Sequence, residues 1–182
     1  MLKPNSKEQK IEFLRWLAGF WDADGCFSIS LAKQRTANDY LAVKPVVSIG
    51  QRSDHVWVID YIYKNLGFGK TYLINRDTVI GKATWQTTKM DDAIKIAKLL
   101  EPYLVLKKEK AQRLIEALEL WKNTVHKGEL KLRRNCKKTR SKEDVLKVVK
   151  IATTLNEDRQ EKRYHNYKKY KDWEKLIDKW YD

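Results

Sequence analysis

The sequence contains little cysteine and histidine. Its 182 residues include only two cysteines and three histidines, namely Cys26, Cys136, His55, His126 and His165. None of them has the Cys-x-x-Cys or paired-histidine spacing of a zinc site, and two distant cysteines do not resemble the disulfide framework of a small secreted domain. We therefore expect no zinc centre and interpret both cysteines as reduced and structural.

Long hydrophobic runs and flexible linkers are also missing. No segment approaches the roughly 18 uninterrupted apolar residues that a membrane-spanning helix needs, and residues 1–10 are polar. We therefore expect no membrane partner and an intracellular protein of the cytoplasm or nucleoid, with a eukaryotic organelle as the alternative. The chain has no internal repeat and no Pro/Gly/Ser-rich linker, so we expect one ordinary domain with an appended element.

Positive charge is abundant. Lysine and arginine number 38 against 24 acidic residues, which gives a formal charge of +14. This excess favours a polyanionic partner. Aromatic residues make up 11% of the chain and are interleaved with the charges, which favours nucleic acid. The alternatives are a protein of a membrane surface and a soluble protein that is merely basic.

The first predicted helix covers residues 7–23 and begins with a capping box formed by Ser6 and Gln9. Apolar side chains surround nearly its whole second half, so this helix needs two apolar neighbours. Ala18 and Gly19 would let another backbone come close, as small residues do at tight helix crossings. We expect the protein's own core on one side of the helix, and a partner subunit could supply the other surface.

Beyond this helix the apolar period changes from 3.6 to 2, which predicts two hairpins, the second with its turn around Arg76, Asp77 and Gly81. The predicted strands are residues 26–33, 41–51, 70–75 and 84–89. The second predicted helix begins at a cap formed by Ser53 or Asp54 and ends at residue 66. The later predicted helices cover residues 91–100, 107–123, 142–155 (capped by Ser141) and 158–180. This order predicts an α+β domain whose antiparallel sheet carries helices on one face.

Residues 17–25 read LAGFWDADG and lie at the end of the first predicted helix. This segment resembles the signature of the LAGLIDADG homing endonucleases at seven of nine positions, and both departures exchange one apolar residue for another. The αββαββα order of the predicted elements is similar to the family core. Gln51 and Lys107 stand where family members often carry a glutamine and a basic residue. The resemblance covers roughly residues 11–120.

The resemblance implies an αββαββα core with a four-stranded antiparallel, saddle-like sheet facing double-stranded DNA, followed by C-terminal helices. It also implies a homodimeric, Mg²⁺-dependent, intron- or intein-associated enzyme that cleaves a long, roughly palindromic site and needs no small-molecule cofactor. We expect residues 1–123 to form the endonuclease core and residues 124–182 a helical extension. The alternatives are an RNA-binding splicing maturase and a DNA-binding regulator on the same fold.

The resemblance assigns catalysis to Asp24, Gln51 and Lys107, and metal binding to Asp24 and the Ala23 carbonyl. A carboxylate is electrostatically disfavoured at a helix C-terminus, and a bound cation would reverse that cost. These hard oxygen ligands suit Mg²⁺, with Ca²⁺ or Mn²⁺ as other possible occupants.

Each assignment has a plainer alternative. Asp24 could be a capping residue, Gln51 an ordinary polar residue at a strand end, and Lys107 part of a solvated basic face. Asp22, the other acid of the motif, does not match the ligand position, and we interpret it as part of the helix-end structure.

Alternation along the strands predicts which side chains point away from the core and toward the major groove. The candidate DNA-binding residues are Ser28, Ser30, Gln34, Lys44, Ser48, Arg52, Tyr72, Arg76, Thr84, Gln86 and Thr88. A strand of about 10 residues spans on the order of 33 Å, so two subunits would cover roughly 20 base pairs. The alternative is an ordinary solvent-exposed sheet. The candidate dimer interface is Leu14, Ala18, Gly19 and Trp21.

The C-terminal stretch from residue 159 to residue 180 mixes lysines with aromatic residues that recur about every three positions. This spacing favours a helix that docks by its aromatic edge and turns its lysines toward solvent or phosphate. We hypothesise that it lengthens the contact with the DNA backbone.

Overall fold

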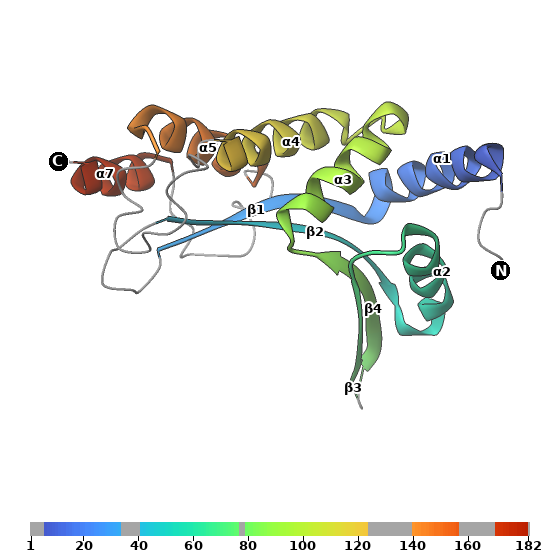
Figure 1. Ribbon diagram of the computed structural model, residues 1–182. Helices are drawn as coiled ribbons and strands as arrows, with labels where there is room; N and C mark the ends of the chain where they lie inside the picture. The colour runs from blue at the N-terminus through green and yellow to red at the C-terminus, as the bar shows by residue number, and fades with distance from the viewer. Residues whose placement is uncertain (1–5, 34–40, 77–78, 124–139, 157–169, 182) are drawn as a thin grey trace. The chain divides into compact units, whose positions relative to one another are not determined.

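A computed structural model gives the fold and describes residues 6–33, 41–76, 79–123, 140–156 and 170–181. The elements are α1 (Lys7–Asp24), β1 (Gly25–Lys33), β2 (Leu41–Arg52), the 3₁₀ turn η1 (Ser53–His55), α2 (Val56–Leu66), β3 (Lys70–Arg76), β4 (Val79–Thr87), α3 (Met90–Leu100), the 3₁₀ turn η2 (Glu101–Tyr103), α4 (Lys108–Asn123), α5 (Lys142–Leu155) and α7 (Tyr170–Tyr181) (Figure 1). The four strands form one sheet in the order β1-β2-β4-β3. The predicted α+β class and αββαββα order are therefore confirmed.

Helix α1 has the predicted capping box, in which Gln9 N donates to Ser6 Oγ (3.2 Å) and Ser6 N donates to Gln9 Oε1 (3.4 Å). The helix continues one residue past the predicted end, to Asp24, and Gly25 follows in an extended conformation. Its buried face carries Leu17, Ala18 and Trp21, all fully shielded within the chain. The motif helix is thus anchored in the protein's own core up to its last turn.

The second helix begins later than predicted. Neither Ser53 nor Asp54 caps it, because residues 53–55 form the separate turn η1 and α2 starts at Val56 without a side-chain cap. The Asp54 carboxylate is engaged by Arg52 instead, with Arg52 Nη2 2.8 Å from Asp54 Oδ2. The predicted stop is confirmed, since Gly67 ends the helix with a left-handed φ of 71°.

The second hairpin is shifted relative to the prediction. Strand β4 starts at Val79 rather than Thr84 and ends at Thr87 rather than Lys89, so Gly81 lies within a strand and not in the turn. The chain leaves the sheet after Thr87, and Lys89 occupies the N-cap position of the following helix α3 without a side-chain cap. The Lys89 N–H donates to Thr87 Oγ1 (3.3 Å).

The chain forms two compact units, one made of Met1–Phe27 with Pro45–Gln112 and the other of Ser28–Lys44 with Arg113–Asp182. In the first unit, α2 packs on β3 and β4, and α1 packs on α3 (Figure 1). None of the described helices is long and apolar enough to cross a membrane. The predicted division at residue 123 stays a prediction.

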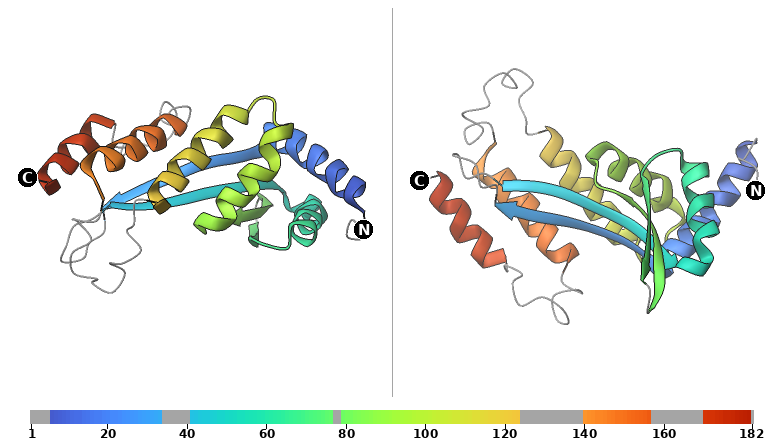
Figure 2. Two further views of the ribbon diagram at one scale, coloured as in Figure 1. Left: turned by 45° about the horizontal axis from the view of Figure 1, so that its top comes forward. Right: turned by 90° about the horizontal axis from the view of Figure 1, so that it is seen from below.

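In the second unit, α5 and α7 lie side by side (Figure 2). The predicted cap of α5 is confirmed, because Asp144 N donates to Ser141 Oγ (3.0 Å). Helix α7 buries Trp173 and Ile177 and exposes its lysines, as the aromatic spacing predicts. Residues 157–169 of the predicted C-terminal helix lie outside the described residues.

Candidate active site

The C-terminal end of α1 brings together the three candidate catalytic residues. Gln51, near the end of β2, donates from Nε2 to Asp24 Oδ2 at 2.6 Å. Lys107, just before α4, donates from Nζ to the Trp21 carbonyl (2.9 Å) and the Ala23 carbonyl (3.2 Å). Three positions far apart in sequence therefore meet within one site.

Lys107 supplies the positive charge that the end of α1 lacks. The last turn of this helix has no basic residue of its own, while its carbonyls carry partial negative charge. The Lys107 ammonium group satisfies two of those carbonyls. Partial burial lowers the pKa of Lys107, and the nearby carboxylate of Asp22 acts in the opposite direction.

The two acids of the motif have different surroundings. Both carboxylate oxygens of Asp22 accept backbone hydrogen bonds, Oδ2 from Val105 N and Oδ1 from Lys107 N, each at 2.8 Å. This supports the interpretation of Asp22 as helix-end structure. Asp24 is exposed, and within the part of the chain that the structure describes its Oδ1 accepts no hydrogen bond.

The donors at this helix end are the Asp24 carboxylate and the Ala23 carbonyl, which are hard oxygens of the kind that Mg²⁺ and Ca²⁺ prefer. Among the described residues, no group of three or more His, Cys, Asp and Glu side chains is arranged to hold a metal ion. A cation held here would therefore keep water ligands or take further oxygens from a substrate, and Mg²⁺ retains water in this way.

The motif has a glycine at position 25 because there is no room for a side chain, and not because the backbone conformation requires one. Its φ of −75° and ψ of 157° suit any residue. A Cβ built there would lie 2.3 Å from Cγ and Cδ1 of Trp21, whose indole is fully buried. The close approach of strand and indole fixes the point where β1 leaves the end of α1.

Three rows of side chains cross the sheet on the face opposite its buried residues. The antiparallel registers place Ser48, Gln86 and Lys70 in one row, Gly50, Thr84 and Tyr72 in the next, and Arg52, Lys82 and Ile74 in the third. On the other face, Val47, Ile49, Ala83 and Trp85 are buried. The predicted residues Ser48, Tyr72, Thr84 and Gln86 therefore share one accessible face.

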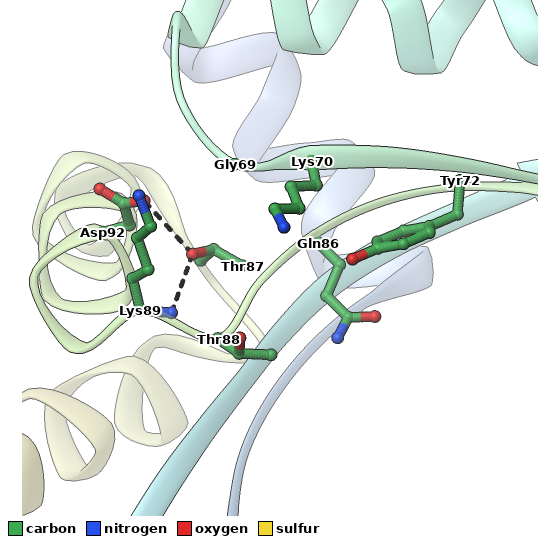
Figure 3. Close-up of a pocket in the computed structure, with 8 residues that line it drawn as sticks. All are labelled: Gly69, Lys70, Tyr72, Gln86, Thr87, Thr88, Lys89 and Asp92. Carbon is green, nitrogen blue, oxygen red and sulfur yellow. Dashed lines mark hydrogen bonds between the residues drawn. The ribbon is translucent and has the colours of Figure 1, made fainter.

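A small pocket of about 90 Å³ lies at the end of the first row (Figure 3). It is lined by Gly69, Lys70, Tyr72, Gln86, Thr87, Thr88, Lys89 and Asp92. Thr87 Oγ1 contacts Asp92 Oδ2 (3.5 Å), which joins the end of β4 to α3. Thr88 was expected on a strand, but it lines this pocket from the connection that follows β4.

The remaining candidate DNA-binding residues divide into three groups. Ser30 and Lys44 are exposed, as expected, and Arg52 is exposed but paired with Asp54. The expectation that Ser28 is accessible is wrong: its side chain is only 5% exposed, because β1 is covered on both faces at that point. Gln34 and the side chain of Arg76 lie outside the described residues.

Two basic residues on the accessible face are absent from the predicted set. Lys82 is exposed and lies opposite Arg52 in the strand register. It is absent from the predicted set because the predicted strand starts only at Thr84. Lys70 is exposed opposite Gln86. Lys82 follows from the alternation once the start of β4 is known, and Lys70 lies in the predicted strand 70–75 on the same face as Tyr72.

The candidate dimer interface also needs correction. Leu14 is 8% exposed, and Ala18 and Trp21 are fully buried within the chain, so these three are core residues rather than a free surface. Gly19 is exposed, and apart from its own stretch of helix no atom of the described residues lies within 4 Å of the position that its Cβ would take. Trp16, on the same side of the helix, is 43% exposed. The apolar residues around the helix therefore divide between core and surface differently from the prediction.

The sequence profile of a family described as LAGLIDADG endonuclease matches residues 17–117. The DNA endonuclease I-CvuI of Chlorella vulgaris is 30% identical over 130 residues, which cover 68% of this chain and 73% of that protein. A probable intron-encoded endonuclease of Schizosaccharomyces pombe, Cox1-I1b, is 28% identical over 105 residues, which cover 58% of this chain. This chain spans about a quarter (26%) of the length of that protein.

Solved structures show the same fold. The crystal structure of I-CvuI in complex with its target in the presence of calcium has a TM-score of 0.74, and the superposition covers 96% of this chain and 98% of that one at 17% identity. The archaeal intron-encoded homing endonuclease I-Vdi141I, complexed with DNA, has a TM-score of 0.69 at 22% identity, covering 93% and 97% of the two chains.

Proposed function

Because this chain belongs to the LAGLIDADG endonuclease family, we propose that it is a homing endonuclease that cuts both strands of DNA at one long, roughly palindromic site. The cut is a Mg²⁺-dependent hydrolysis of phosphodiester bonds, and the gene lies in an intron or intein. One observation carries this proposal: Asp24, Gln51 and Lys107 converge on the end of the motif helix.

The proposed metal ligands are Asp24 and the Ala23 carbonyl. Gln51 orients the Asp24 carboxylate through Oδ2 and leaves Oδ1 accessible, while Lys107 holds the Ala23 carbonyl. A divalent cation bound there would activate water and neutralise the charge that develops on the scissile phosphate. Lys107 adds a positive charge beside that phosphate, and Gln51 keeps the carboxylate in one orientation.

The three rows of side chains on the sheet are the proposed DNA-reading face. Their lysine, arginine, glutamine and hydroxyl groups are the types that contact base edges and phosphates. Since the chain carries a net charge of +14, we expect DNA affinity to fall steeply as salt rises.

A second copy of the chain is the proposed partner at the exposed side of α1. Gly19 leaves room there for a close approach, and Trp16 on the same side of the helix is 43% exposed. In the segment that binds Asp22 at the end of the helix, Val105 is 81% and Leu106 is 77% exposed. Burying such side chains favours association. Replacing Gly19 with Trp should yield a monomer in sedimentation equilibrium, whereas a wild-type protein that is already monomeric and still cleaves would contradict the dimer.

We also propose that residues 124–182 extend the DNA contact beyond the core of residues 1–123. The exposed lysines of α7 are Lys171, Lys175 and Lys179. Replacing all three with glutamine leaves the buried Trp173 and Ile177 in place. If they contact phosphates, the slope of log K against log salt should fall by roughly one per lost contact. An unchanged slope would refute the extension.

The decisive test uses a plasmid that carries the insertion locus without its insert. Wild-type protein is incubated with it in Mg²⁺ or EDTA, alongside Asp24→Asn and the matched control Glu143→Gln, an exposed acid on α5. We expect discrete double-strand cleavage that needs Mg²⁺, disappears in Asp24→Asn and persists in the control. Tight RNA binding without cleavage would instead support a splicing maturase, and cleavage that survives Asp24→Asn would overturn the site.

A further inference from the structure

The segment before α4 carries Lys107, yet much of it is not anchored by apolar packing. Leu104 is 4% exposed, but the next two residues, Val105 and Leu106, are 81% and 77% exposed. The backbone at Lys107 therefore depends on polar contacts. The Asp22 carboxylate makes two of these, to Val105 N and Lys107 N, both at 2.8 Å.

We propose that Asp22 is a positioning residue that holds the backbone of Lys107 so that its ammonium group reaches the end of α1. This inference rests on the proposed function, in which Asp24 and not Asp22 is the metal ligand, and it assigns a role of its own to Asp22. Asp22 acts on the backbone of Lys107, and the Lys107 side chain returns to the Trp21 and Ala23 carbonyls, which flank Asp22 in sequence. The Asp22 side chain therefore fixes the backbone of Lys107, and the Lys107 side chain binds the backbone on either side of Asp22, although the two residues are 85 positions apart in sequence.

Helix electrostatics favour this arrangement. The Lys107 carbonyl accepts from Ala111 N at 3.0 Å, so Lys107 is the N-cap residue of α4. The start of a helix carries partial positive charge and unpaired N–H groups, and a carboxylate there is favourable. The same carboxylate partly offsets the effect of burial on the Lys107 ammonium group. One side chain thus joins the negative end of α1 to the positive end of α4.

The contacts also separate Asp22 from the proposed metal ligand. Each of its two oxygens already accepts a backbone hydrogen bond, and these two bonds turn the carboxylate toward the segment before α4. Asp24, two residues later, has an oxygen that accepts none from the described residues. The two acids of the motif therefore have separate tasks, one toward the protein and one toward the reaction.

Cleavage kinetics test the proposal. In Asp22→Ala, we expect the single-turnover cleavage rate to fall on the order of 100-fold, because a misplacement of about 1 Å costs that much. DNA affinity should stay within about twofold of wild type, and the oligomeric mass should not change. Asp22→Asn keeps one acceptor oxygen, so it should lose only about 10-fold. Glu143→Ala removes a negative charge elsewhere and should behave as wild type. A loss of affinity and stability with no selective loss of rate would show a structural role only.

A second readout does not depend on cleavage. Lys107 Nζ is held by two carbonyls, whereas the side chain of its neighbour Lys108 is 49% exposed. Lysine acetylation followed by mass spectrometry should show slow labelling of Lys107 in wild type, and labelling as fast as Lys108 in Asp22→Ala. Unchanged labelling of Lys107 in the variant would overturn the proposal.

The two readouts separate this proposal from the function on which it rests. If Lys107→Ala cleaves normally, the proposed role of Lys107 in catalysis fails, and the labelling result still decides whether Asp22 positions it. If Lys107→Ala loses cleavage and Asp22→Ala does not, the positioning role fails and the proposed function stands.

Discussion

Replacing Gly25 with alanine should destabilise the protein through a steric overlap with Trp21. The added Cβ would lie 2.3 Å from Cγ and Cδ1 of the indole, well inside the roughly 3.5–4.0 Å of an ordinary carbon contact. The Trp21 ring cannot move freely, because its centroid lies 5.4 Å from that of Phe27 and 5.8 Å from that of Trp85. Backbone strain does not contribute, since the φ and ψ of Gly25 suit alanine.

The magnitude follows from this packing. Forcing one extra carbon into a packed core costs about 1–3 kcal/mol. For a chain of this size, each kcal/mol lowers the melting temperature by roughly 2–4 °C, so we expect a decrease of about 2–12 °C. Urea unfolding followed by circular dichroism measures the free energy directly.

A double-mutant cycle isolates the cause. Trp21→Leu removes the ring and lowers the free energy of unfolding by itself, but Gly25→Ala should then cost much less than in wild type, because the overlap is gone. If Gly25→Ala costs the same in both backgrounds, or costs nothing in wild type, the steric explanation of this glycine is refuted.

Three further predictions concern single contacts. Gln51→Ala removes the donor to Asp24 and should reduce the cleavage rate about 10- to 100-fold, as the loss of a residue that orients a metal ligand does; DNA affinity measured by fluorescence anisotropy should not change, and an unchanged rate would contradict the orienting role. Asn156→Ala leaves the buried Ile29 carbonyl without its 2.8 Å donor and should lower the free energy of unfolding by about 1–3 kcal/mol. Ser141→Ala removes the N-cap of α5 and should cost about 1 kcal/mol in the same urea experiment, and a neutral result would mean that this cap is not needed.

Local signals in the sequence predicted most of the elements. The box formed by Ser6 and Gln9 marks the start of α1, Ser141 marks the start of α5, and Gly67 marks the end of α2, because caps act through neighbouring backbone groups. The prediction failed where local signals compete. Asp54 has the side chain of a cap, but the nearby Arg52 binds it, so α2 begins at Val56.

The sequence by itself determined the class of the fold, which depends on periodicity, and the family motif, which depends on residue types at fixed spacing. The three candidate catalytic residues followed from the resemblance to the family that this motif carries. Only the tertiary structure decided how they meet. The contact of Gln51 with Asp24 spans 27 positions and that of Lys107 N with Asp22 spans 85. Likewise, it decided that Leu14, Ala18 and Trp21 are buried while Gly19 is open. Contacts and burial of this kind depend on how elements pack, and a helical period shows that a face is apolar without showing what covers it.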